Sequence, residues 1–166
     1  MIKAQVVSTS YTRLDNATQY AANDALSDST SAPAALEFAG VKSNTGRVVG
    51  LRVIDGANQA TLPQMEVYIF DGSAAPTATN DNAEFGLTDA NALNLVCIFA
   101  LSSFYDLDVT SGTNGNAAAM GAPAGLTEVP FECGKDSTLY GLVKILNAYT
   151  PIAKEVFIFE LLLDLD

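Results

Sequence analysis

Carboxylates are the main candidates for chemistry in this sequence, which holds 19 acidic residues and no histidine. The side chain best suited to proton transfer near neutral pH is therefore absent, and triads built on histidine are excluded. A carboxylate pair of the kind that hydrolyses glycosides remains conceivable, with candidates at Glu66, Glu132, Glu155 and Glu160. These glutamates lie beside basic residues or in ordinary strand alternation, and the chain has no tryptophan to stack on a sugar ring. We therefore expect no catalytic residue and no enzyme.

A calcium site is the next chemistry that the residue types suggest. Asp106 and Asp108, followed by Asn114 and Asn116, offer oxygen ligands within one loop. Their spacing does not place an acidic ligand at the twelfth position, as an EF-hand loop requires. Residues of these types also bond to their own backbone in turns, and this explanation is simpler. We expect neither a metal nor a cofactor, and the sequence leaves calcium binding by the loop acids undecided.

The two cysteines, Cys97 and Cys133, predict no metal site, because no histidine is present to complete one. Cys97 lies inside the apolar run 95–99, which favours a buried thiol. The chain lacks the dense cysteine framework of small secreted domains. Pairing between the two cysteines therefore stays open.

The net charge of −11 argues against several partners. The eight basic residues are scattered, so no basic stripe is available for nucleic acid or for anionic lipid. No segment approaches the roughly 18 continuous apolar residues of a membrane span. The first residues lack the apolar stretch of a signal peptide. We expect synthesis in a host cytoplasm, with no direct nucleic-acid or membrane partner.

Short apolar runs separated by loops rich in Gly, Ser, Asn and Asp indicate the elements that must position any site. No amphipathic helix of 10–15 residues lies between them, so an alternating strand–helix fold is not expected. About eight strands predict one all-β domain over 1–166, a two-sheet antiparallel sandwich and most simply a jelly roll, with an Ig-like sandwich or a closed barrel as alternatives. An extended N-terminal arm at 1–12 is a further option, and Gly50 suggests a bulge. The expected strands are 3–13, 33–38, 47–55, 65–70, 93–101, 126–133, 138–146 and 154–165.

Several of these strands are apolar on both faces. In a strand, alternate side chains point to opposite sides, and a solitary sandwich needs only one apolar side. Either the long loops 73–92 and 102–125 cover the second face, or another protein does. We expect a homo-oligomer, either a dimer or a trimer, or docking on a larger assembly. The residues predicted for this oligomer or capsid interface are Val156, Ile158, Leu162, Val96, Ile98, Tyr140 and Leu142.

Residues 10–24 contain most of the stretch NATQYAANDAL, which runs from Asn16 to Leu26. This stretch resembles a segment near the start of small structural proteins of tailed bacteriophages, which have an N-T-x-Y-x-x-x-D pattern followed by a strand. The later order is also similar, with strands of the kind at 48–54 and 67–70 and then an Asp/Asn-rich excursion near 81–85. The resemblance covers residues 10–100.

This resemblance implies a β-rich, oligomeric head protein that decorates or cements a phage capsid. Its partner would be the major capsid protein, and its place would be the outside of the virion. One alternative is a receptor- or glycan-binding module of a virion fibre or surface assembly, with contacts from the loops around Tyr105 or Tyr149. A bacterial surface or pilus subunit is a further alternative.

Overall fold

The computed structural model describes residues 3–57, 61–72, 74–107, 117–133 and 137–166. Within these ranges nearly all regular structure is β-strand, as expected for short runs rich in β-branched and aromatic residues. Regular helix is limited there to α1 (Asp89–Ala92), whose N-cap is Thr88, and no helix is long and apolar enough to cross a membrane. The strands are β1 (Lys3–Thr12), β2 (Ala25–Leu26), β3 (Leu36–Phe38), β4 (Thr45–Asp55), β5 (Met65–Phe70), β6 (Leu95–Leu101), β7 (Tyr105–Asp106), β8 (Ala117–Gly121), β9 (Val129–Glu132), β10 (Leu139–Ile145) and β11 (Val156–Leu165).

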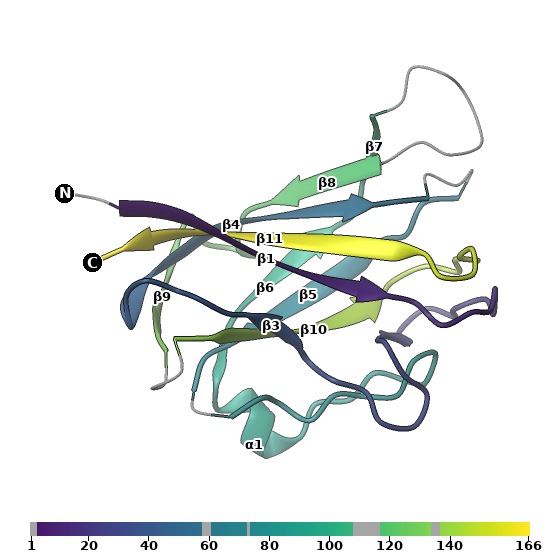
Figure 1. The fold of residues 1–166 in the computed structure, drawn as a ribbon, viewed down its shortest axis with the longest axis horizontal. Coiled ribbons are helices and arrows are strands. Elements are labelled where there is room, and N and C mark those ends of the chain that lie inside the picture. The colour runs from purple at the N-terminus through teal and green to yellow at the C-terminus, as the bar shows by residue number, and fades with distance from the viewer. Residues whose placement is uncertain (1–2, 58–60, 73, 108–116, 134–136) are drawn as a thin grey trace.

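In the described part of the chain, these strands form a six-stranded and a five-stranded sheet (Figure 1). The first has the order β1-β11-β4-β8-β7, and β9 also pairs with β4. The second has the order β2-β10-β5-β6, and β3 also pairs with β10. All strand pairs are antiparallel.

The strand order is that of a jelly roll. The first strand pairs with the last (β1 with β11), the second with the next to last (β2 and β3 with β10), and the third with its counterpart (β4 with β8 and β9). The middle strands, β5 and β6, pair with each other. Such a folded-over hairpin, with β2/β3 and β8/β9 each acting as one interrupted strand, has the eight-stranded double Greek-key pattern. The predicted two-sheet jelly roll is thereby confirmed.

The main core lies between the two sheets and follows strict alternation. In β11, the side chains of Phe157, Phe159 and Leu161 point inward and are buried, whereas their sequence neighbours are partly exposed. The pairing of β11 with β4 shifts register opposite Gly50, because Val49 is an extra residue there. The bulge suggested by Gly50 is therefore present, and it restores the inward direction of Val48.

Two other expectations concern the N-terminus and the cysteines. Residues 3–12 form β1, which pairs with β11 along its whole length, so they are part of the sheet rather than a free arm. Cys97 and Cys133 are buried free thiols. Burial raises the pKa of Cys97 to about 12, so this thiol stays protonated.

Candidate interaction surface

The two sheets differ in what covers their outer faces. The outer face of the five-stranded sheet is covered by the chain's own segment 74–92, which packs Phe85 and Leu87 against it. The rings of Tyr68 and Phe85 stack with their centroids 4.9 Å apart. This second core is made of Ala35, Tyr68, Phe70, Tyr140 and Leu142, with Ala78, Phe85, Leu87, Leu95 and Ile98 packed on it.

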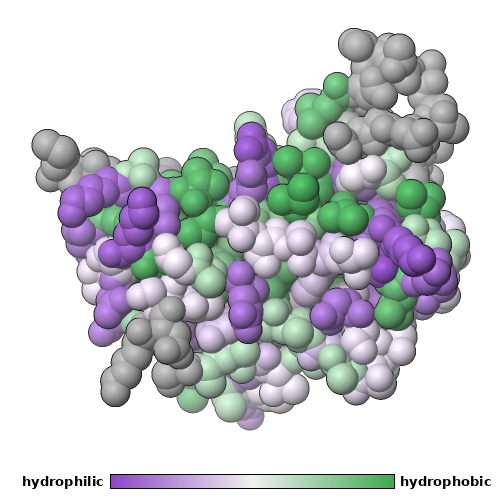
Figure 2. Space-filling view, in the orientation of Figure 1, coloured by the Kyte–Doolittle hydropathy of each residue, from purple (hydrophilic) through white to green (hydrophobic). Residues whose placement is uncertain are grey.

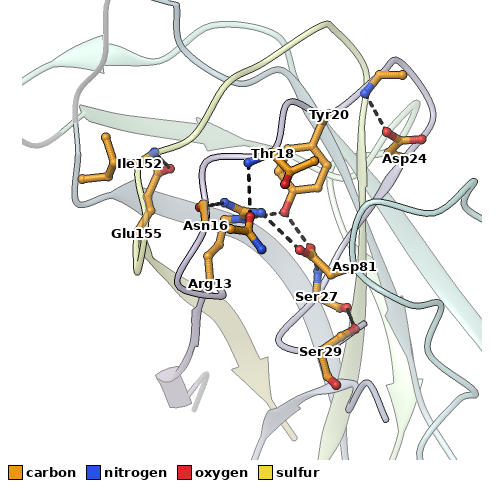
Figure 3. Close-up of polar contacts among 11 residues, drawn as sticks. Arg13, Asn16, Thr18, Tyr20, Asp24, Ser27, Ser29, Asp81, Ile152 and Glu155 are labelled. Atoms are coloured by element: carbon orange, nitrogen blue, oxygen red, sulfur yellow. Dashed lines mark hydrogen bonds and ion pairs between the residues drawn. The ribbon is translucent and has the colours of Figure 1, made fainter. Parts of the chain in front are cut away.

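A buried carboxylate anchors the covering segment. Asp81 accepts hydrogen bonds from Arg13 Nη2 at 3.1 Å, from Tyr20 Oη at 2.6 Å and from the Ser27 backbone N–H at 3.0 Å (Figure 3). The side chains of Arg13 and Asp81 are 0% and 1% exposed. Arg13 also donates from Nε to Tyr20 Oη at 2.5 Å. A buried ion pair is tolerated only when its remaining polar atoms are bonded as well, and this cluster meets that requirement.

The segment that carries the phage resemblance builds this anchor. Asn16 Oδ1 accepts the Thr18 N–H at 3.2 Å, and Asp24 Oδ2 accepts the Ala21 N–H at 2.6 Å, so both residues stabilise turns (Figure 3). Between them Tyr20 is fully buried and stacks on Tyr149 at 6.3 Å. Asn16, Tyr20 and Asp24 of this segment therefore stabilise the fold.

The glutamates proposed as catalytic candidates do not converge. Glu66 pairs with Lys144, and Glu160 pairs with Arg52. Glu132 is exposed. Of Asp106, Asp108, Asn114 and Asn116, the last three lie outside the described residues. Among the residues that the structure describes, no three His, Cys, Asp or Glu side chains gather as a metal site.

Glu155 differs from the other glutamates because it is buried next to another acid. It accepts hydrogen bonds from Tyr149 Oη and from the Ile152 N–H, the latter at 3.1 Å. Burial, together with the hydrogen bond and charge of Asp55, raises the pKa of Glu155 to about 8. Asp55 and Glu155 are 0% and 2% exposed, so a substrate has no access to either carboxyl group.

The outer face of the six-stranded sheet presents apolar side chains to solvent. Met120, Tyr105 and Val6 are 75%, 72% and 58% exposed. Figure 2 shows hydrophobic side chains over the part of the molecule where β4 and β8 lie, with hydrophilic side chains between them. We call this surface the open face. It comprises Val6, Ile54, Tyr105, Leu107, Met120, Val156, Ile158 and Leu162.

Strand register orders the open face in rows. Ile158, Ile54, Ala118 and Tyr105 lie opposite one another across β11, β4, β8 and β7. The next row contains the Arg52–Glu160 ion pair, with Met120 beside it. A shallow groove of about 340 Å³ runs along these rows and is lined by Arg52, Ile54, Tyr105, Leu107, Ala118 and Met120.

The predicted interface residues divide between the two faces. Val156, Ile158 and Leu162 lie on the open face. Tyr140 and Leu142 are buried in the second core, beneath the chain's own segment, so they are not available at the surface of this chain.

The two remaining predicted residues are also partly buried within this chain. Val96 packs partly against the main core, and Ile98 against the second core. Of the two tyrosines proposed for glycan contacts, Tyr105 is exposed beside the groove, whereas Tyr149 is fully buried.

The sequence did not predict part of the open face or the Arg13–Asp81 ion pair that anchors the covering segment. The sequence predicts a loop over 102–125, with covering of an apolar face as one of two alternatives, whereas residues 105–106 and 117–121 extend the six-stranded sheet as β7 and β8 and widen the open face. The Arg13–Asp81 pair joins positions 68 apart, and no local pattern marks such a contact.

Comparisons with known proteins show only distant likeness. No protein-family model matches the chain, and no curated protein matches it. A chain of the cyanophage Pam1 capsid asymmetric unit is 12% identical, with 99% of this chain and 86% of that chain covered and a TM-score of 0.34. The catalytic domain of a GH87 alpha-1,3-glucanase in complex with nigerose is 11% identical, with 90% and 29% covered and a TM-score of 0.25. Neither TM-score reaches 0.5, so neither likeness assigns a function.

Proposed function

We propose that this chain is a structural protein of a bacteriophage virion, which binds the outside of the capsid as a decoration or cement protein. The observation that carries the proposal is the open face. Among the residues that the structure describes, one sheet is covered by the chain's own loop, anchored by a buried ion pair, and the other sheet's apolar face is left uncovered. The jelly roll, a fold common among viral capsid domains, and the phage-like segment at residues 10–24 support the same function.

The open face suits a protein surface better than nucleic acid or lipid. Its apolar side chains surround one ion pair, Arg52–Glu160, and resemble the apolar centre and charged elements of protein interfaces. The chain's net charge of −11 repels phosphate backbones and anionic membranes. The proposed partner is therefore the major capsid protein. The proposal includes no catalytic role, because the buried acid pair cannot meet a substrate.

Many weak contacts make this arrangement effective. Complete burial of one large apolar side chain contributes roughly 1.5–3 kcal/mol, and side chains that are already half-buried contribute less. A single copy would then bind a shell modestly. Copies that each bridge neighbouring capsid subunits reinforce the shell together, because linked contacts gain from effective concentration.

Sedimentation with emptied shells of the phage that encodes the chain tests the proposal. The wild-type protein should sediment with shells to a fixed saturating ratio. Ile158→Asp and Leu162→Asp should weaken binding about ten-fold or more, as for residues central to an interface. Leu93→Asp is the control, because Leu93 is also apolar, is even more exposed, and caps α1, which is not part of the six-stranded sheet. Absence of wild-type binding, or equal binding by all four proteins, would contradict the proposal.

Glycan binding is the second candidate, and the groove favours it. The exposed Tyr105 and Arg52 both line the groove, so an aromatic ring and a hydrogen-bond donor border one shallow depression. A glycan array probed with the wild-type protein and with Tyr105→Ala separates the two functions. Specific binding that Tyr105→Ala removes, without sedimentation on shells, would establish the glycan module and reject capsid docking.

A further inference from the structure

β1 ends the six-stranded sheet, and its free side is long and regular. The strand has ten residues, and β11 is its strand partner in the sheet order (Figure 1). Opposite residues in an antiparallel pair alternate between exchanging hydrogen bonds and exchanging none. Two backbone hydrogen bonds show which residues of β1 face β11: Arg13 N–H to Glu155 O at 2.8 Å and Gly56 N–H to Val156 O at 2.9 Å.

These bonds assign each backbone group of β1 to one side. Glu155 faces β1, whereas Val156 faces β4, so odd-numbered residues of β1 bond to β11. Even-numbered residues therefore direct their N–H and C=O groups away from the sheet. No backbone hydrogen bond outside the strand ladders involves them among the residues that the structure describes. The set consists of Ala4, Val6, Ser8, Ser10 and Thr12, all with exposed side chains.

The edge lacks the features that natural edge strands use against pairing. Such features are proline, bulges and inward-pointing or repeated charges. Residues 3–12 contain no proline, no acidic residue and one charge, Lys3 at the end. In a chain of net charge −11, this strand is therefore a segment where two copies can pair without placing carboxylates of the paired strands opposite each other.

The inner side of β1 is held in place by side-chain bonds to the neighbouring segment. Gln5 donates to Gly40 O at 2.8 Å and accepts from the Lys42 N–H at 2.9 Å. Tyr11 Oη donates to Ala34 O at 2.7 Å. Both are odd-numbered residues, so these bonds attach the strand to the neighbouring segment while the outer backbone groups stay available. A preformed edge loses little conformational freedom when it pairs.

We propose that two copies of this chain pair antiparallel through β1 about a two-fold axis at Ser8, joining their six-stranded sheets into one continuous sheet. The outward N–H and C=O groups of the two copies can bond only when even-numbered residues of one β1 lie opposite even-numbered residues of the other. The register centred on Ser8 uses the whole set, with Ala4 opposite Thr12 and Val6 opposite Ser10. An interface of this kind is isologous and closes at the dimer. The inference deepens the proposed function, and rests on it for its purpose, because Val6 continues the open face up to the edge.

The solution mass of the purified protein tests the pairing without any shell. Light scattering at micromolar concentration should give twice the chain mass of 17.4 kDa. Ser8→Pro should give the monomer mass, because proline lacks the N–H that faces the second copy. The ladder to β11 does not use that N–H, so Ser8→Pro should keep the wild-type unfolding temperature within a few degrees. Ser8→Ala, which retains the N–H, should remain a dimer.

Cysteine cross-linking tests the register. In a hydrogen-bonded antiparallel pair the Cα atoms are about 5.5 Å apart, within disulfide range. Ser8→Cys should therefore form a disulfide-linked dimer on mild oxidation, whereas Ala4→Cys should not cross-link to itself. A mixture of Ala4→Cys and Thr12→Cys should cross-link. The native thiols of Cys97 and Cys133 are buried and do not interfere.

Each outcome decides between the two proposals. A monomeric wild type, a trimer, or self-cross-linking of Ala4→Cys would overturn the pairing. A monomer that still sediments with shells overturns the pairing and leaves the proposed function standing. A dimer with this register that does not sediment with shells supports the pairing and rejects capsid docking.

Discussion

At the residue scale, two buried polar clusters stabilise one end of the sandwich. Arg13, Tyr20 and Asp81 connect the end of the first strand to the segment that covers the five-stranded sheet. Tyr149, Glu155 and Asp55 lie next to them, and Tyr149 stacks on Tyr20. Both clusters hold ionisable groups away from water, so their partners decide whether they stabilise or destabilise the fold.

The first prediction concerns the ion pair. Asp81→Ala leaves the Arg13 guanidinium buried without a counter-charge, which should lower the free energy of unfolding by about 3–5 kcal/mol. Denaturant unfolding measures this change. Asp15→Ala is the matched control, because the Asp15–Lys154 pair is about two-thirds exposed and such pairs contribute about 1 kcal/mol or less. Similar losses in the two variants would contradict the anchoring role of Asp81.

The second prediction concerns Glu155. Its pKa rises from 4.5 to about 8 on folding, so the folded state keeps a proton that the unfolded state releases between these values. The stabilisation is complete below pH about 4.5 and is lost as the pH rises through about 8. The unfolding temperature of the wild type should fall between pH 5.5 and 8.5 more steeply than that of Glu155→Gln. Parallel curves would show that Glu155 titrates normally.

At the element scale, the pairing of β4 with β11 places two backbones in close contact. A Cβ atom at Gly46 would lie 2.5 Å from the carbonyl oxygen of Asp164, and a backbone atom cannot move aside cheaply. At Gly86, in the covering segment, an added Cβ meets nothing within 4 Å. Glycine is therefore required at the first position by steric fit and not at the second.

The third prediction follows from this contrast. Gly46→Ala should destabilise the protein by about 1–3 kcal/mol, the range found for overpacking. Gly86→Ala should be neutral or slightly stabilising, since it only restricts the unfolded chain. Thermal unfolding of both variants provides the comparison. A neutral Gly46→Ala would mean that β4 and β11 are further apart than described.

The elements were the part of the fold most accessible from sequence. The predicted strand 154–165 corresponds to β11 (Val156–Leu165), because every second residue from 157 to 165 is apolar and buried. The two-residue strands β2 and β7 were not predicted, since their positions depend on pairing with β10 and β8. The sequence pattern correctly predicts strands that are apolar on both faces. It does not show whether the second face is covered by the chain itself or by another molecule.

At the scale of the whole molecule, the apolar outer faces of the two sheets differ in whether the chain covers them. Tyr140 and Leu142 are covered by the segment that Asp81 holds, whereas Ile158 and Leu162 remain on the open face. The difference arises from a contact between Arg13 and Asp81, which are far apart in the sequence. Assignment of interface residues from sequence therefore required knowledge of the tertiary fold.

The fourth prediction concerns the covering segment. Phe85→Ala removes the ring that stacks on Tyr68 and should lower the free energy of unfolding by about 2 kcal/mol, less than for a fully buried ring. It should also raise the binding of a hydrophobic dye, because part of the second core becomes exposed. Leu107→Ala, on the open face, should lower dye binding without loss of stability. Equal dye binding in the two variants would contradict the distinction between the faces.

Oxidative footprinting of the shell-bound protein tests the central claim most directly. Met120 is 75% exposed on the open face, and Met65 is fully buried, so hydroxyl radicals should oxidise Met120 rapidly and Met65 slowly in the free protein. On emptied phage shells, Met120 should become protected together with Tyr105, whereas exposed Leu93 should react as before. A shell-bound protein whose Met120 oxidises at the free rate would show that the open face is not the docking surface.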